Sequence, residues 1–327
     1  MTEKARLKEH LRFQADWCRK LGSPLYATLL ELTERDVESG GPCFRVLEGH
    51  GADPLGSVPT LRFLGAVHRL VLEEKARWTP FLDTVETHAA TLRQAMDRTV
   101  QTNEVQRCAA LIGGFLVAAA ETGLPLRTLE VGASAGLNLR WDHYRYESAW
   151  GDPQSPVQFR DVYPVRMPPF SIPARVVERR GCDRDPVDPC SLDGQLTLLS
   201  YTWPDQPDRL ARLRGAFEIA QRVPAIVDQA GAVEWLPGCL AERRDGLTTV
   251  VFHSIVMQYM TPKQRTEMRA ILEDAGARAS ARAPLAWLRM EPGGEQTEVS
   301  MTMWPGGREH VLARSGFHGH PVEWIHE

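Results

Sequence analysis

From Gln101 onward, strand-like apolar segments alternate with helix-like segments, and this alternation most restricts how the chain can fold. Runs of β-branched and aliphatic residues predict strands at residues 126–131, 174–179, 224–229, 247–254 and 284–290. Helical patterns separate most of these segments, and such alternation predicts a parallel sheet with right-handed crossovers. Segments 298–304 and 309–314 are joined by a Pro-Gly-Gly turn and predict an antiparallel hairpin at one sheet edge.

The first hundred residues have a different pattern. Leu7 and Leu11 fall on one helical face, and Ser23, followed directly by proline, is typical of the start of a second helix. No run in this region alternates like a strand. We therefore predict an all-helical N-terminal domain at residues 1–100 and an α/β domain at residues 101–327.

Composition and charge limit the classes of molecule that the protein is expected to bind and its expected location. The chain of 327 residues is 43% hydrophobic and 24% charged, as in ordinary globular proteins. A net charge of −4 gives no excess of positive charge with which to bind nucleic acid or an anionic membrane.

The longest apolar run, residues 108–120, is shorter than the ~20 residues of a membrane span. The N-terminus lacks a secretory pattern, and the six scattered cysteines indicate free thiols. We expect a cytoplasmic protein that binds small molecules or proteins; a homo-oligomer is left open.

The first predicted strand leads into a glycine-containing loop that fits two kinds of site. Residues 132–136 (GASAG) match G-x-S-x-G, the nucleophile elbow of a serine hydrolase. The same residues match a glycine-rich loop that holds a nucleotide-like cofactor at a helix N-terminus. Both sites need a strand, a tight turn and a helix, so the local pattern does not decide between them.

The surroundings of the loop favour a cofactor over a nucleophile. In an α/β-hydrolase several strands precede the elbow, whereas residues 1–125 here are mostly helical in pattern. Glu130 stands two residues before the turn, where a carboxylate suits a cationic or hydroxyl-rich ligand and opposes an oxyanion. A serine hydrolase that uses Ser134 with His253 or His318 is the less favoured alternative.

Glu130, Gly132 and Gly136 resemble motif I of the class I S-adenosylmethionine-dependent methyltransferases, an acid followed by three glycines at alternate positions. Ser134 stands where the middle glycine is usual. The resemblance implies a Rossmann-type, mostly parallel sheet with an antiparallel C-terminal hairpin. It also implies S-adenosylmethionine as the cofactor and methyl transfer to an unknown small-molecule or protein acceptor. A non-catalytic binding or regulatory protein with a degenerate methyltransferase fold is the alternative, which the substituted glycine and the lack of an acceptor motif favour.

Nearly the whole chain also resembles an uncharacterised bacterial family, domain of unknown function 2332. The resemblance is carried by QTNEVQR, LEVGASAGLNLRWDHYRY, RGCDRDPVD, LSYTWPDQ, VVFHSIVMQYM and MTMWPGG. It identifies relatives and implies no reaction.

Ligands of open parallel sheets bind at the carboxyl ends of the strands, and candidate cofactor residues are therefore sought there. The predicted cofactor-binding residues are Glu130, Gly132, Ala133, Ser134, Gly136, Asn138, Asp183 and Asp228. The methyltransferase resemblance implies that Glu130 faces the methionine amino group, that Asp183 holds the ribose hydroxyls and that Asp228 lies near the adenine. A tight turn without ligand, a solvated acidic turn and a turn cap are the respective structural alternatives.

The fourth strand and the helix before the first strand supply the predicted catalytic and substrate residues. His253 and Ser254 end the fourth strand, and a histidine there is able to take a proton from an attacking atom. Asn103 and Gln106 form a capping-box pattern for the preceding helix, whose start is predicted near the ligand end. The predicted substrate-binding residues are Gln101, Asn103, Arg107, Gln258 and Tyr259.

The C-terminal segment contains His318, His320 and His326. Alternating histidines share one strand face and are able to ligate a metal, but no acidic or cysteine cluster accompanies them. A surface tail is the favoured interpretation, and no metal is predicted.

Overall fold

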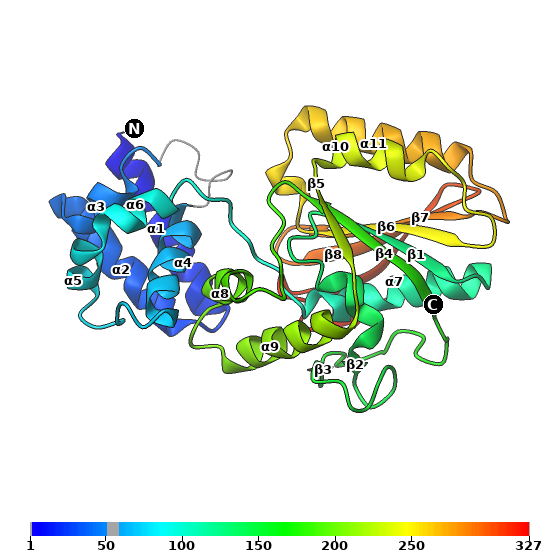
Figure 1. The fold of residues 1–327 in the computed structure, drawn as a ribbon, viewed down its shortest axis with the longest axis horizontal. Helices are drawn as coiled ribbons and strands as arrows, with labels where there is room; N and C mark the ends of the chain where they lie inside the picture. The colour runs from blue at the N-terminus through cyan, green and yellow to red at the C-terminus, as the bar shows by residue number, and fades with distance from the viewer. Residues whose placement is uncertain (1, 51–58, 327) are drawn as a thin grey trace. The chain divides into compact units, whose positions relative to one another are not determined.

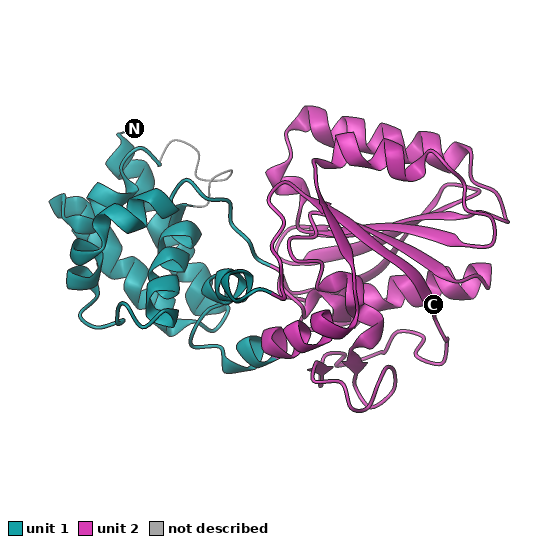
Figure 2. Cartoon of the chain, viewed as in Figure 1, with its two compact units in different colours: residues 1–102, 191–211 teal, residues 103–190, 212–327 magenta. Residues whose placement is uncertain are grey.

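The computed structural model describes residues 2–50 and 59–326. The chain forms two compact units (Figure 2). Unit 1 comprises Met1–Thr102 and Ser191–Ala211, and unit 2 comprises Asn103–Cys190 and Arg212–Glu327. Residues 191–211, which the sequence analysis placed in the α/β domain, group with the helical unit instead.

The described part of unit 1 is helical, as the sequence predicts. Its helices are α1 (Glu3–Lys20), α2 (Pro24–Ser39), α3 (Pro42–Leu47), α4 (Pro59–Leu72), α5 (Phe81–Thr87), α6 (Ala89–Ala95) and α8 (Leu192–Ser200). The predicted start of α2 is confirmed: the Ser23 hydroxyl accepts a hydrogen bond from the Tyr26 amide, and proline occupies the first turn. Leu7, Leu11 and Leu30 belong to the buried core of this unit.

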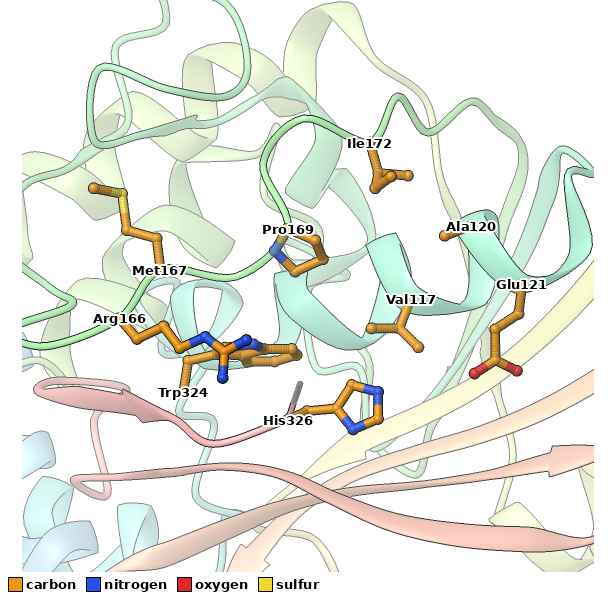
Figure 3. Close-up of a pocket in the computed structure, with 9 residues that line it drawn as sticks. All are labelled: Val117, Ala120, Glu121, Arg166, Met167, Pro169, Ile172, Trp324 and His326. Carbon is orange, nitrogen blue, oxygen red and sulfur yellow. The ribbon is translucent and has the colours of Figure 1, made fainter.

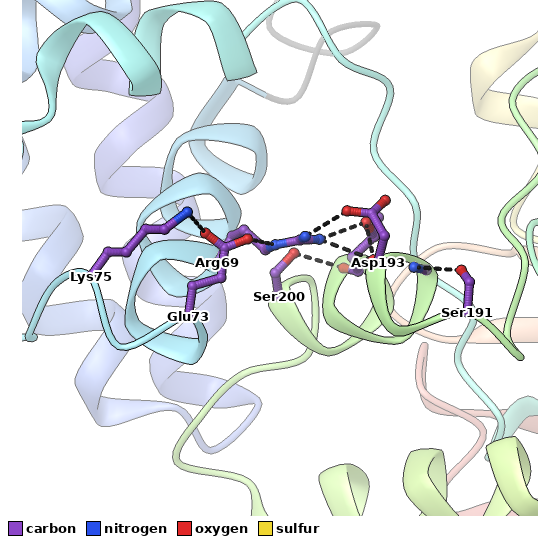
Figure 4. Close-up of polar contacts among 8 residues, drawn as sticks. Arg69, Glu73, Lys75, Ser191, Asp193 and Ser200 are labelled. Carbon is purple, nitrogen blue, oxygen red and sulfur yellow. Dashed lines mark hydrogen bonds and ion pairs between the residues drawn. The ribbon is translucent and has the colours of Figure 1, made fainter.

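Arg69 joins α8 to α4 within unit 1 (Figure 4). Its guanidinium donates to the Asp193 carboxylate at 2.6 Å, to the Asp193 carbonyl at 3.0 Å and to the Thr197 hydroxyl at 3.0 Å. Glu73, on the other side, accepts from the Arg69 Nε. The guanidinium fork thus ties a segment from residue 191 onward to a helix that ends at residue 72.

The described residues of unit 2 form an eight-stranded sheet in the order β10-β9-β8-β7-β6-β1-β4-β5. The strands are β1 (Leu126–Val131), β4 (Val176–Asp183), β5 (Ile226–Gln229), β6 (Thr248–Ser254), β7 (Leu285–Pro292), β8 (Thr297–Trp304), β9 (Arg308–Ser315) and β10 (Val322–Trp324). The first five are parallel and the last three antiparallel. The prediction of a mostly parallel sheet with an antiparallel C-terminal hairpin is confirmed; β10 and a small ladder, β2 (Arg145–Tyr146) with β3 (Gln158–Phe159), were not predicted.

Helices cover both faces of this sheet (Figure 1). Helices α10 (Ala232–Leu240) and α11 (Pro262–Ala277) lie on one face, and α7 (Arg107–Thr122) lies on the other. Leu129 and Val131 of β1 pack with Trp235 and Met268 on the first face. Because side chains alternate along a strand, Glu130 points to the α7 face. Helix α9 (Pro207–Arg222) contributes residues to both units.

Two local predictions around β1 are wrong. The helix before β1 begins at Arg107, not at Asn103, and its N-cap residue, Gln106, makes no capping side-chain bond. The loop after β1 leads into a short 3-10 helix, η1 (Asn138–His143), and residues 132–175 contain no α-helix. The predicted α-helix N-terminus at the glycine loop is therefore absent. No helix among the described residues is long and apolar enough to cross a membrane.

Candidate functional site

The carboxyl ends of β1 and β6 lie side by side where the sheet order reverses. The chain runs from β1 to β4 and β5 on one side, then crosses back to β6 and β7 on the other. In open α/β sheets this reversal opens a crevice at the carboxyl ends, where ligands bind. The loop at residues 132–137, the turn at residues 254–257 and Asp183 meet this criterion.

The loop after β1 has three residues in the left-handed region. The φ angles are +69° at Gly132, +51° at Ser134 and +66° at Gly136. Glycine adopts this conformation freely, whereas a serine does so at a cost of roughly 1–2 kcal/mol. Ser134 therefore keeps the backbone shape expected of the missing middle glycine, with strain that neighbouring bonds must offset.

Side chains on two sides hold the loop in this shape. The Asp183 Oδ2 accepts from the Ser134 amide at 2.9 Å, and its Oδ1 accepts from the Asp185 amide at 2.9 Å. The Asn103 Oδ1 accepts from the amides of Ala135 at 3.3 Å and Leu137 at 3.0 Å. Asn103 is thus a brace for the loop and not a helix cap, because its only acceptor oxygen is engaged there.

The amide groups of the loop are all engaged within the protein. Gly132 and Ala133 donate to the Cys182 carbonyl at 2.9 and 3.0 Å, and Gly136 donates to the Ala133 carbonyl at 2.7 Å. Together with the Asp183 and Asn103 bonds, these account for every amide from residue 132 to residue 137. The loop from residue 132 to residue 137 therefore presents no free N–H group to an anionic ligand, because the fold has already paired these amides.

Glu130 is the buried acid that the sequence placed before the loop. Its side chain is 2% exposed, and its Oε2 has no hydrogen-bond partner. Burial, and after it the charge of Asp183, raises the pKa of Glu130 well above its usual range. Leaving a buried carboxyl oxygen unpaired costs about 1–3 kcal/mol. Such an atom indicates a place for a donor that the chain itself does not supply.

Asn138 lies beside Glu130 and links it to α7. Asn138 is buried in η1, and its Oδ1 accepts from the Cys108 thiol at 3.2 Å. Hydrogen bonding to Asn138 opposes the rise in the pKa of Glu130, which places the two side chains in contact. Glu130, Asn138 and Cys108 thus form a buried polar row between β1 and α7.

His253 does not have the geometry of a catalytic base. The side chain is 0% exposed; its Nδ1 lies 2.7 Å from the Glu291 Oε1, and its Nε2 accepts from the Trp287 Nε1 at 3.0 Å. Because the indole donates to Nε2, the ring proton must be on Nδ1. No nitrogen is left to take a proton from an acceptor, which corrects the predicted role. Ser254 ends β6 and is half-buried.

The predicted substrate residues fall into three places. Arg107 lies at the crevice, where its guanidinium donates to the carbonyls of Ser254 and Phe317, each at 3.2 Å. Gln258 and Tyr259 are exposed in the 3-10 helix η2 (Met257–Tyr259), which follows β6. Gln101 belongs to unit 1 and is buried, with its amide donating to the Thr99 hydroxyl.

Asp228 is the next-to-last residue of β5 and is held by two neighbours. Its Oδ2 accepts from the Arg180 Nε at 2.6 Å and from the Trp235 Nε1 at 2.7 Å. The hydrogen bond from Arg180 lowers the pKa of Asp228. These bonds tie β5 to β4 and α10, so the same oxygen is not available to a ligand.

Glu291, at the end of β7, was not predicted. Its Oε1 accepts from the His253 Nδ1 at 2.7 Å, the Val256 amide at 2.9 Å and the Met257 amide at 3.4 Å. Its Oε2 is buried without a partner. The sequence did contain a signal for Glu291. This residue is the acid directly after the predicted fifth strand, and it therefore lies at the edge of the sheet where ligands bind.

The geometry disfavours a serine hydrolase. Both nitrogens of His253 are engaged, so this histidine is not the base of Ser134. The amides that would form an oxyanion hole next to Ser134 are bonded to Asp183 and Asn103.

A surface pocket of about 350 Å³ lies elsewhere in unit 2 (Figure 3). Val117 and Glu121 of α7, Arg166 and Trp324 are among its lining residues, together with His326. It contains no residue of the glycine loop. The described residues contain no cluster of metal-ligating side chains.

The fold and its polar residues define an α/β protein with a candidate ligand site at the carboxyl ends of parallel strands. Residues 8–324 match a family described as an uncharacterized protein conserved in bacteria, DUF2332, and the chain belongs to that family. This confirms the resemblance carried by the sequence stretches. A comparison with curated proteins found no match.

Proposed function

We propose that this protein binds S-adenosylmethionine at the carboxyl ends of β1 and β6 and transfers its methyl group to a small-molecule or protein acceptor. The observation that carries the proposal is the unpaired, buried Oε2 of Glu130. It stands two residues before a left-handed loop at the reversal of the sheet, in a fold that we propose is methyltransferase-like.

The site fits the cationic end of this cofactor better than its anionic groups. Glu130 offers a desolvated carboxyl oxygen to an ammonium group, and charge-assisted bonds of this kind are about twice as strong as neutral ones. The loop amides offer nothing to a carboxylate, because Cys182, Asp183 and Asn103 already accept from most of them. Glu130 and the loop backbone would therefore hold the methionine part through its amino group.

Binding of a cation at Glu130 is coupled to a proton. Because burial raises the pKa of Glu130 well above its usual range, the free protein holds this proton more firmly than an exposed carboxyl group does. The proton must leave before the carboxylate pairs with an ammonium group, so affinity rises with pH until Glu130 ionises in the free protein.

The cofactor, when bound, supplies an electrophilic methyl group. The chain's own part would be to orient the ligand against the braced loop and to keep water from it. Arg107 donates to the carbonyl of Ser254 and so fixes the carboxyl end of β6 beside the proposed cofactor site.

Binding without methyl transfer is the second candidate function. It is favoured by His253, whose ring nitrogens are both engaged, so the fourth strand presents no free base. Methyl transfer without a base remains feasible for an acceptor whose attacking atom needs only to be aligned with the methyl group. Incubating the protein and cell extracts with methyl-labelled S-adenosylmethionine separates the two: cofactor binding without labelled product supports the second candidate.

Calorimetric titration with S-adenosylmethionine and S-adenosylhomocysteine tests the binding proposal. We expect Glu130→Gln to weaken affinity about 10- to 100-fold, the effect of losing a hydrogen bond to a charged group of about 1.5–3 kcal/mol. Glu121→Gln, at an exposed acid on α7, is the matched control and should bind like the unmodified protein. Absence of binding of either compound at millimolar concentration would sink the proposal.

A further inference from the structure

The turn after β6 contains a strained residue. Ile255 has φ +53°, although β-branched side chains rarely adopt the left-handed region. Such a conformation is strained and persists only where the surroundings impose it. The question is therefore what holds residues 254–257 in this shape.

Glu291 supplies the restraint. Its Oε1 accepts from the amides of Val256 and Met257, the two residues directly after Ile255. The same oxygen accepts from His253, which Trp287 fixes from its other side. The guanidinium groups of Arg289 and Arg269 in turn lie over the Trp287 ring, at 4.2 and 5.2 Å from its centre. Side chains from α11, β6 and β7 thus form a series of contacts, and its last member, Glu291, binds the backbone amides of this turn.

The restrained turn places Val256 against the glycine loop. A Cβ atom built on Gly132 would lie 2.4 Å from the Val256 Cγ2, well inside contact distance. The Val256 side chain therefore occupies the space beside Gly132. That space borders the loop proposed above to receive the cofactor.

We propose that Glu291 is a positioning residue of the site, which latches residues 255–257 so that Val256 limits the room beside Gly132. The inference rests on the proposed function only in naming the cofactor as the molecule that uses this room. The latch itself is a property of the free protein and is tested without ligand.

Amide hydrogen exchange, measured by NMR, tests the latch. Glu291→Met keeps the length of the side chain but removes the acceptor, and it should speed exchange at Val256 and Met257 at least tenfold. Glu291→Gln keeps one acceptor oxygen and should restore most of the protection. The Ile255 amide is an internal control, since it donates to the Met290 carbonyl at 2.8 Å and not to Glu291.

Two further readouts separate a latch from general loosening. The nuclear Overhauser contact between the Val256 methyls and the Gly132 Hα should be lost in Glu291→Met and kept in Glu291→Gln. Amides of the central strand β1 should exchange as in the unmodified protein once rates are corrected for global stability. Unchanged exchange at Val256 and Met257, or an intact contact in Glu291→Met, overturns the proposal.

The effect on the ligand is measured with Val256→Ala. Removing two methyl groups beside Gly132 should tighten binding of S-adenosylmethionine about fivefold. Val177→Ala, at the opposite end of β4, is the matched truncation and should leave the affinity unchanged. Equal affinity of Val256→Ala and the unmodified protein contradicts the role of Val256. If the unmodified protein binds no S-adenosylmethionine, the proposed function fails, while the exchange data still decide the role of Glu291.

Discussion

The carboxyl group of Glu130 is buried at a free-energy cost that an amide would not carry. Its raised pKa means that the folded state holds the proton more firmly than the unfolded chain. This contribution to stability is complete below the unfolded pKa of about 4.3 and is lost as the pH rises through the folded value. Burial of Glu130 thus works against stability at neutral pH.

Glu130→Gln should therefore be more stable than the unmodified protein at neutral pH. The difference in free energy of unfolding should be small near pH 4 and should widen as the pH rises from there through the raised pKa of Glu130. Urea denaturation of both proteins across this range provides the measurement. A difference independent of pH would contradict the assignment of the buried proton to Glu130.

Ser134 offers a second test at the residue scale. Ser134→Gly should relieve the strain of a left-handed serine and stabilise the protein by about 0.5–1 kcal/mol, after the greater freedom of glycine in the unfolded chain is counted. Ser134→Ala keeps the strain and should show no such gain. The free energy of unfolding in urea distinguishes the two, and equal stability of both variants would argue against strain at this position.

At the scale of elements, α7 depends on two consecutive glycines. A Cβ on Gly113 would lie 2.1 Å from the Trp324 ring of β10, and one on Gly114 would lie 2.4 Å from Leu288 of β7. Alanine is favoured over glycine in a helix by about 1 kcal/mol, but here the close approach of the strands outweighs that preference. The helix is thereby seated directly against the sheet.

Gly113→Ala should destabilise the protein by about 1–3 kcal/mol, the usual effect of overpacking. Gly238 of α10 is the matched control, because a Cβ there meets nothing within 4 Å. Gly238→Ala should be neutral or stabilising by up to about 1 kcal/mol. Thermal unfolding of both variants checks the pair, and equal effects would show that packing at Gly113 is not decisive.

The elements differ in how far sequence predicts them. At the start of α11, Thr261 and Gln264 form a reciprocal capping box, a pattern that is readable from sequence because both partners are local. The similar Asn103 pattern misled, because its oxygen found the amides of a loop more than 30 residues away. The position of Glu130 and the tight turn after β1 followed from spacing, whereas the engagement of His253 depended on Trp287 and Glu291 from another strand. Hydrogen bonds between residues that are far apart in the sequence produce no local sequence pattern, so they could not be predicted from it.

At the scale of the whole molecule, residues 191–211 belong to unit 1 although the chain has by then built part of unit 2. Arg69→Met should release α8 from α4, because the bonds to Asp193 and Thr197 are lost. We expect faster amide exchange across residues 192–200, with exchange in β1 unchanged. Lys75→Met, which removes only the outer partner of Glu73, is the control and should leave α8 protected. Equal protection in Arg69→Met would show that apolar packing alone retains α8.

The split of unit 1 along the chain has a consequence for the order of synthesis. On a ribosome that adds roughly 5–20 residues per second, residue 211 emerges on the order of 5–20 s after residue 102. During that interval α4 has no α8 to cover it, and Arg69 has neither Asp193 nor Thr197 to bind. The helical unit, although first in sequence, is completed only after β1 and β4 have been made, so its maturation is timed by the unit that carries the candidate site.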